Sequence, residues 1–141
     1  KTSDRFLVGF DMLKPKETLE AAYNDSLGVT SKFNKNILNV LNRELNANFD
    51  PLHFKHVAFF NEQEERVEMH LQAKQNIEVT IDALGLVVDM NKDETIHTEI
   101  CSKFSRRSVE QMADNAGLKI TQWYFDSTEW FSLTELALKD L

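Results

Sequence analysis

The sequence predicts an α/β fold of the mixed α+β kind, forming one ordinary globular domain or part of one. Three observations lead to this prediction. The spacing of hydrophobic residues changes from a helical period to an alternating one and back along the 141 residues. Hydrophobic residues make up 42% of the chain, and a chain of this length buries roughly 68–70% of its unfolded surface. The single cysteine, Cys101, excludes an internal disulfide, so the core has to form without one.

The charge and the first residues narrow the class of protein. A net charge of −7 disfavours nucleic acids and anionic membranes, which bind clusters of Lys and Arg. No apolar run approaches the roughly 20 residues that span a bilayer, and the opening KTSDRFLVGF lacks the features of a signal peptide. We therefore expect a reducing, cytoplasmic location. The chain begins without Met and enters an apolar segment almost at once, which suggests a fragment of a longer protein.

The first third of the chain predicts a strand followed by two helices. Residues 5–13, RFLVGFDML, form a nearly continuous apolar run of strand length that stops before Pro15. Pro15 suits the first turn of a short helix, whose apolar positions are Leu19, Ala22 and Tyr23. A longer helix begins at Thr30 and ends by residues 46–50. Its apolar stripe consists of Phe33, Ile37, Leu38, Leu41 and Leu45.

The middle of the chain predicts antiparallel strands, because its hydrophobic period falls to about two. HVAFFN and RVEMHLQAK flank an acidic hairpin turn, and QNIEVTID and GLVVDM flank a turn at residues 83–85. The segment TIHTEICSKF places alternate side chains on opposite faces. One face carries Ile96, Thr98, Ile100, Ser102 and Phe104, and the other carries His97, Glu99, Cys101 and Lys103.

The last third returns to a helix and adds a strand pair. Ser105 suits an N-cap, and Gly117 stands where a left-handed C-terminal residue belongs. The apolar stripe of this helix consists of Val109, Met112, Ala113 and Ala116. LKITQWYFD and WFSLTELAL then form two strands around a turn at residues 127–129.

Four histidines and one cysteine raise the question of a metal site. His53 and His56 are too close in sequence for a helical i, i+4 pair. His70 and His97 lie on separate predicted strands, so no established zinc spacing occurs. We therefore expect no metal.

His97, Glu99 and Cys101 point the same way from one predicted strand. Neighbours on one face of a strand lie about 7 Å apart, so the imidazole is too far from the thiol for nucleophilic catalysis. A carboxylate and a small polarisable group on a rigid strand remain, and they suit a ligand with two ring nitrogens. The alternative is an ordinary solvent-facing strand edge.

The segment AYNDSLGVTSKFN joins two predicted helices and contains Tyr23, Thr30 and Phe33. It could present hydroxyls and an aromatic wall to a small molecule, or it could be a simple interhelical turn. The acidic run at residues 62–65 is better explained as a solvated hairpin tip than as a cation site. No GxGxxG motif or P-loop occurs, so the glycine-rich loop of a nucleotide-type cofactor is not in this chain.

Four strings resemble one enzyme family. In chain order they are LVGFDMLKP, LEAAYNDSLGVTSKFNKNILNVLNRELNANFD, HVAFFNEQEERVEMHL and ETIHTEICSKFS. Together they closely resemble the C-terminal half of the histidine-specific methyltransferases that use S-adenosylmethionine (SAM). That family makes trimethylhistidine (hercynine) on the ergothioneine pathway, and the resemblance covers nearly the whole chain.

The resemblance implies a Rossmann-like methyltransferase core with an inserted substrate-recognition domain. Residues 1–13 and 105–141 would be the C-terminal part of the core, and residues 14–104 the substrate-recognition domain. The SAM-binding loop would lie upstream of Lys1, so this fragment alone would be inactive. Its sheet would lack neighbours, and open edges of this kind favour self-association.

The resemblance also implies a role for six residues in binding the amino-acid substrate. Tyr23 would hold the carboxylate of the substrate, and Glu99 one nitrogen of its imidazole. Cys101 stands where well-known members have a serine that contacts the other nitrogen, and a thiol is a weaker hydrogen-bonding group. The full set is Tyr23, Thr30 and Phe33 around the amino-acid end, and Met69, Glu99 and Cys101 around the imidazole. No catalytic residue is expected, because SAM supplies the reactive methyl group.

These implications lead to one expected function and two alternatives. The chain is expected to be the substrate-binding part of a SAM-dependent amino-acid Nα-methyltransferase acting on L-histidine. One alternative is a non-catalytic module that binds amino acids or oligomerises. The other is a related methyltransferase for a different amino acid, which the cysteine at position 101 keeps open.

Overall fold

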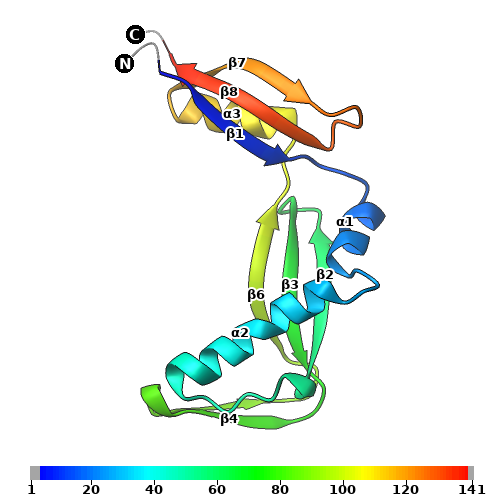
Figure 1. Ribbon diagram of the computed structural model, residues 1–141, viewed down its shortest axis with the longest axis vertical. Helices are drawn as coiled ribbons and strands as arrows, with labels where there is room; N and C mark the ends of the chain where they lie inside the picture. Colours follow the sequence, from blue (N-terminus) through cyan, green and yellow to red (C-terminus); the bar gives the residue numbers. More distant parts are fainter. Residues whose placement is uncertain (1–3, 140–141) are drawn as a thin grey trace. The chain divides into compact units, whose positions relative to one another are not determined.

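The computed structural model describes residues 4–139, and its fold is mixed α+β with antiparallel sheets (Figure 1). The chain divides into two compact units. Unit 1 comprises Lys1–Pro15, Glu62–Glu65 and Ser102–Leu141. Unit 2 comprises Lys16–Asn61 and Arg66–Cys101. In the described part of the chain, no helix is both long and apolar enough to cross a membrane.

Unit 1 is a three-stranded sheet with one helix packed on one face. The strand order is β1-β8-β7, and β8 runs antiparallel to both neighbours, so β1 and β7 run in the same direction. The helix buries Val109 against Phe10 and Met12 of the first strand and its extension. The elements are β1 (Phe6–Asp11), α3 (Arg106–Asn115), β7 (Leu118–Phe125) and β8 (Phe131–Leu138).

Local sequence signals explain where these elements begin and end. Ser105 is confirmed as the N-cap of α3: its Oγ accepts the Ser108 N–H at 3.1 Å, and Ser108 Oγ accepts the Ser105 N–H at 2.9 Å. The helix ends before Gly117, whose φ of 70° suits glycine. A Cβ at Gly9 in β1 would lie 2.6 Å from the tip of the exposed Phe131 ring, so a larger residue there would require that ring to move.

Two apolar surfaces of unit 1 are open. The stripe predicted for α3 is only half buried, because Val109 and Ala113 are covered while Met112 and Ala116 are exposed. The exposed half borders an apolar hollow of about 440 Å³ between α3 and the strands β1 and β8. The sheet face away from α3 also exposes large apolar side chains, namely Leu7, Tyr124, Phe131 and Leu133.

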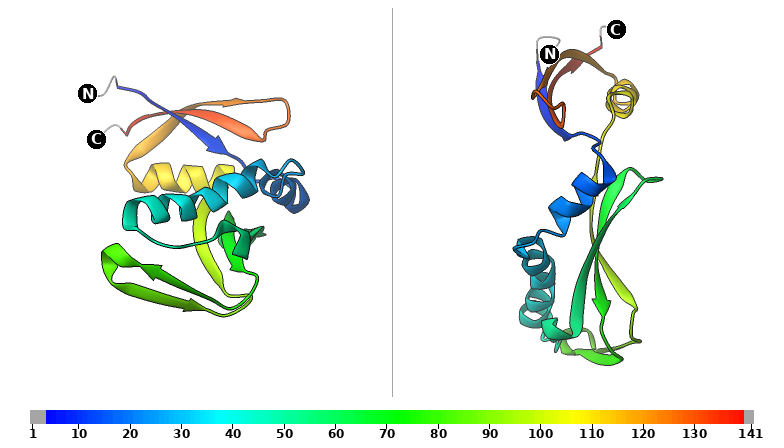
Figure 2. Two further views of the ribbon diagram at one scale, coloured as in Figure 1. Left: turned by 60° about the horizontal axis from the view of Figure 1, so that its bottom comes forward. Right: turned by 90° about the vertical axis from the view of Figure 1, so that its right-hand side faces the viewer.

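Unit 2 is a three-stranded sheet with two helices on one face and a separate two-stranded ribbon (Figure 2). The strand order is β2-β3-β6. β6 runs antiparallel to β3, because the hydrogen bonds from Ala73 to Glu94 and from Lys103 to Glu65 pair opposite ends of the two strands. The elements are α1 (Lys16–Tyr23), α2 (Val29–Leu45), β2 (Phe54–Asn61), β3 (Arg66–Ala73), β4 (Ile77–Ile81), β5 (Leu86–Met90) and β6 (Thr95–Ser102). These agree with the strands and helices that the hydrophobic spacing predicts.

The apolar stripe of α2 is rotated from its predicted position. Leu38 is fully buried, and Leu41 and Leu45 pack on the same core cluster, as expected. Phe33 and Ile37, however, are 62% and 41% exposed, so their placement in the buried stripe is wrong. The position one residue after Phe33 is buried instead, and it is occupied by a polar side chain, Asn34.

Asn34 is buried because it joins α2 to the sheet. Its Nδ2 group donates to His56 Nδ1 at 2.9 Å and to the His70 carbonyl at 3.1 Å. Nδ1 of His56 is therefore an acceptor, so the ring carries its hydrogen on Nε2, which donates to the Tyr23 carbonyl at 2.9 Å. One buried amide thus connects α1 and α2 with β2 and β3.

We expect Asn34→Ala to lower the free energy of unfolding by about 2–3 kcal/mol, because it leaves two buried acceptors without their donor. Asn39→Ala is the matched control, since Asn39 is exposed on the same helix, and it should change stability by less than about 0.5 kcal/mol. Urea unfolding followed by circular dichroism measures both. Equal effects of the two substitutions would contradict the structural role of Asn34.

Candidate functional site

The six predicted substrate-site residues all lie in unit 2. The structure brings Phe33 and Glu99 together, because both line one hollow of about 190 Å³ between α2 and β6. The described lining of that hollow does not include the other four residues. Phe33 is exposed because the apolar stripe of α2 is rotated, and its ring is therefore available to a ligand.

Glu99 and Cys101 lie on β6, at one edge of the sheet as far as residues 4–139 show. Ile96 packs against the core cluster, whereas His97 stacks on His70 on the opposite side of the sheet. Glu99 is exposed and Cys101 is half-buried. Glu99 lines the hollow with α2, and the hydrogen bonds Ala73–Glu94 and Lys103–Glu65 differ in register by one residue, so the predicted common face of His97, Glu99 and Cys101 is not observed. We call the sheet face with Phe59, Glu68, His70 and His97 the open face.

Met69 lies on the other side of the sheet from the open face. Its side chain is 2% exposed, and the alternation of β3 directs it toward the helices together with Val67 and Leu71. Its carbonyl accepts a hydrogen bond from Thr98 Oγ1 at 2.9 Å. Met69 therefore joins β3 to β6 next to Glu99.

Tyr23 and Thr30 lie at the junction of α1 and α2. Tyr23 is the last residue of α1, and its carbonyl accepts the hydrogen bond from His56. Thr30 lies in the first turn of α2, where its N–H donates to Asp25 Oδ1 at 2.8 Å. Hydrogen bonds from the Thr30 and Val29 backbone lower the pKa of Asp25 to about 2. The charged Asp25 carboxylate thus binds the first two N–H groups of α2 at this junction.

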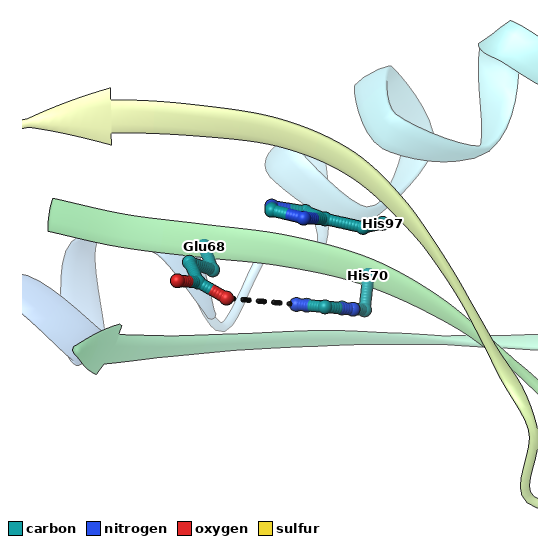
Figure 3. Close-up of side chains that lie close together, drawn as sticks. All are labelled: Glu68, His70 and His97. Atoms are coloured by element: carbon teal, nitrogen blue, oxygen red, sulfur yellow. Dashed lines mark hydrogen bonds and ion pairs between the residues drawn. The ribbon is translucent and has the colours of Figure 1, made fainter. Parts of the chain in front are cut away.

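Three stacked rings cross the open face, one from each strand of the sheet. The Phe59 and His70 ring centroids lie 5.4 Å apart with 17° between the planes. The His70 and His97 centroids lie 4.5 Å apart with 9° between the planes, and Figure 3 shows these two rings edge-on. The sequence pattern placed His70 and His97 on separate strands but did not show that those strands are neighbours.

Glu68 holds the middle ring in place. Its carboxylate accepts hydrogen bonds from Asn61 at 3.0 Å and Arg66 at 2.9 Å, which together lower its pKa to about 2. It also pairs with His70 Nε2 at 3.3 Å. A carboxylate only accepts, so Nε2 carries the hydrogen. Nδ1 of His70 is buried and has no hydrogen-bond partner among the described residues.

Glu68, His70 and His97 are also the described residues that come closest to a metal site. One donor atom from each lies within 4.8 Å of the other two. However, an imidazole binds a metal in its own plane, and the two rings are stacked in parallel. A shared ion would require one ring to leave the stack, so the observed arrangement fits ring stacking better than metal binding.

Comparison with known proteins identifies the family to which the chain belongs. The family model described as "Histidine-specific methyltransferase, SAM-dependent" matches residues 1–138. The chain belongs to this family. It is 43% identical over 131 residues to a histidine N-alpha-methyltransferase of Mycolicibacterium smegmatis, and 41% identical over 137 residues to one of Mycobacterium tuberculosis. It is also 28% identical over 122 residues to ergothioneine biosynthesis protein 1 of Schizosaccharomyces pombe.

The chain covers only part of each relative. The alignments include 93% and 97% of this chain but 41% and 43% of the two bacterial methyltransferases. For the yeast protein they include 86% of this chain and 16% of the relative. The chain thus spans less than half the length of these relatives.

The pKa of Glu68 gives a testable pH dependence. Because folding lowers this pKa from 4.5 to about 2, the ionised carboxylate stabilises the fold above pH 4.5, and that contribution is lost as the pH falls toward 2. We expect Glu68→Gln to be less stable than the wild type at neutral pH, with a gap in melting temperature that narrows below pH 4.5. Glu78→Gln, an exposed carboxylate on β4, should show no such gap. A Glu68→Gln gap independent of pH would refute the assignment.

Proposed function

We propose that this chain is the substrate-binding part of a SAM-dependent Nα-methyltransferase that acts on L-histidine. The observation that carries this proposal is the family match over residues 1–138. The bacterial relatives named histidine N-alpha-methyltransferase support the substrate and the methylated atom. A cytoplasmic location is part of the proposal, because a chain with a single cysteine suits a reducing compartment.

The two units correspond in this proposal to two parts of the enzyme. Unit 2 is the substrate-recognition domain, since it contains all six residues of the expected site. Unit 1 is the C-terminal part of a Rossmann-like core. The common direction of β1 and β7, with antiparallel β8 between them, supports this because a mostly parallel sheet needs strands that run the same way.

The residues of this chain bind and orient the amino acid. Glu99 accepts an imidazole N–H, Cys101 faces the other ring nitrogen, and Tyr23, Thr30 and Phe33 surround the amino-acid end. SAM supplies a methyl group on a sulfonium to the α-amine. We assign no SAM contact to this chain, because its four glycines form no GxGxxG motif. Glu99 acts in specificity, since a ligand without the N–H leaves the carboxylate unpaired.

Mass spectrometry of the full-length protein tests this function. The protein is incubated with SAM and each of the twenty amino acids, and the products are weighed. Gains of about one to three methyl groups on histidine alone support the proposal. Methylation of a different amino acid would keep the methyltransferase function and attribute the changed substrate specificity to Cys101 and its neighbours. No product at all favours a non-catalytic binding module. The isolated 141-residue chain should give no product.

We expect Glu99→Ala in the full-length protein to weaken L-histidine binding about 10- to 100-fold, since a hydrogen bond to a charged group contributes about 1.5–3 kcal/mol. Isothermal titration calorimetry measures the Kd. Glu78→Ala removes an exposed carboxylate from β4 and should leave the Kd unchanged. An unaltered Kd for Glu99→Ala would exclude the proposed role of this residue.

Self-association of the isolated chain is a further part of the proposal. Unit 1 exposes Leu7, Tyr124, Phe131 and Leu133 on one sheet face, and β1 is an edge strand of its described sheet. Open edges and apolar faces pair readily with a second copy. Light scattering of the 141-residue chain should therefore detect a dimer or larger species. The Leu133→Lys substitution should lower the average molar mass of the species in solution. A monomer at high concentration would contradict this expectation.

A further inference from the structure

A hollow in unit 2 gathers positive charge although the chain as a whole is acidic. It lies between the first turns of α2 and the start of β2 and has a volume of about 290 Å³. Its described lining includes the three lysines Lys35, Lys55 and Lys74 and one carboxylate, in a chain with a net charge of −7. None of the six expected substrate residues belongs to this lining. A local excess of ammonium groups attracts small anions.

Lys35 and Lys74 are the two cations that share this hollow. Lys35 is half-buried on α2, and burial lowers the pKa of its ammonium group, which the nearby charge of Lys74 lowers further. The Lys74 ammonium is held in place by the Leu52 carbonyl, to which it donates at 2.8 Å. Lys55 precedes His56 on β2, so strand alternation directs its side chain to the other face of the strand.

The carboxylate in the described lining is already engaged and does not neutralise these lysines. Asp25 accepts the Val29 N–H and the Thr30 N–H, both at 2.8 Å, and these bonds lower its pKa to about 2. Among residues 4–139, neither Lys35 nor Lys74 forms an ion pair with a carboxylate. Two like charges are therefore held close together without a counter-charge from the described chain, and an anion between them would remove their repulsion.

The neutral groups around the two lysines suit an oxyanion. Ser31 lies one helical turn before Lys35, and its hydroxyl makes no hydrogen bond within residues 4–139, so it is free to donate one. The His56 ring uses both nitrogens, one with the Asn34 amide and one with the Tyr23 carbonyl, and thus forms a fixed, uncharged wall. Ammonium groups and a hydroxyl are common donors to the oxygens of a phosphate group.

We propose that this hollow binds a phosphate group, free or as part of a small metabolite, between the ammonium groups of Lys35 and Lys74, with Ser31 donating a hydrogen bond. The two negative charges of a phosphate dianion match the two lysines. The bound anion joins α2 to the residue that follows β3 and therefore stabilises unit 2. The inference does not depend on the proposed function, because the site shares no residue with the expected histidine site.

Isothermal titration calorimetry of the full-length protein with inorganic phosphate, at neutral pH and constant ionic strength, tests the site. We expect a Kd of about 1 mM, weakened about tenfold or more by Lys35→Gln and by Lys74→Gln. Lys32→Gln removes an exposed lysine from the same helix and changes the net charge equally, so it should leave the Kd within about twofold. Equal weakening by Lys32→Gln and Lys35→Gln, or no binding of phosphate at about 20 mM, overturns the inference.

Further titrations identify the source of the phosphate and separate this site from the substrate site. Tighter binding of glycerol 3-phosphate than of inorganic phosphate supports a phosphorylated metabolite as the ligand, and weaker binding supports free phosphate. Phosphate should bind equally well in the presence of saturating L-histidine. Displacement of phosphate by L-histidine would make the hollow part of the substrate site and overturn the inference. Because phosphate binding is measured without SAM, a failed methylation assay leaves this result unaffected.

A melting experiment shows that the variants remain folded. Lys35→Gln relieves the repulsion with Lys74, so without phosphate it should melt no lower than the wild type. Added phosphate should raise the melting temperature of the wild type and of Lys32→Gln, and it should raise that of Lys35→Gln much less. A phosphate-dependent rise of the same size in all three proteins would contradict a site at Lys35.

Discussion

The position of the buried Asn34 amide decides where the candidate site can form. Its two N–H groups hold α2 against β2 and β3, through His56 Nδ1 and the His70 carbonyl. Satisfying a buried amide in this way fixes the rotation of the helix about its axis. Phe33 and Ile37, which an apolar stripe would bury, consequently face the hollow that Glu99 also lines. The same network fixes the Tyr23 carbonyl through His56, so both ends of the expected substrate site depend on one polar contact.

The two faces of the unit 2 sheet carry different kinds of side chain. Leu71 and Ala73 pack under α2 in the core cluster, while Glu68 and His70 from the same strand lie on the open face. Burying one face allows the other to carry polar and aromatic groups that contribute little to the core. Glu68 makes this face ordered, because its charge is stabilised by Asn61 and Arg66 and its second oxygen holds His70.

Much of the fold follows from the sequence because its signals are local. The periods of α2 and β3, the N-cap at Ser105 and the left-handed residue at Gly117 each depend on neighbours within about one turn or one strand. The burial of Asn34 and the stacking of His97 on His70 depend on which distant segments become neighbours. Spacing within one strand contains no information about its partner, so these contacts could not be predicted from it.

The two units differ in how completely their own elements bury their apolar side chains. Unit 2 has a cluster of eight buried residues enclosed by α2, the sheet and the β4–β5 ribbon. In unit 1 the cluster is smaller, and Leu7 and Phe131 are exposed on the face that α3 does not cover. The bacterial relatives are more than twice as long as the matched segment, so their additional residues are sufficient to supply such a cover. The described elements of unit 2 thus cover its core by themselves, whereas those of unit 1 leave one sheet face open to further residues or to a second copy.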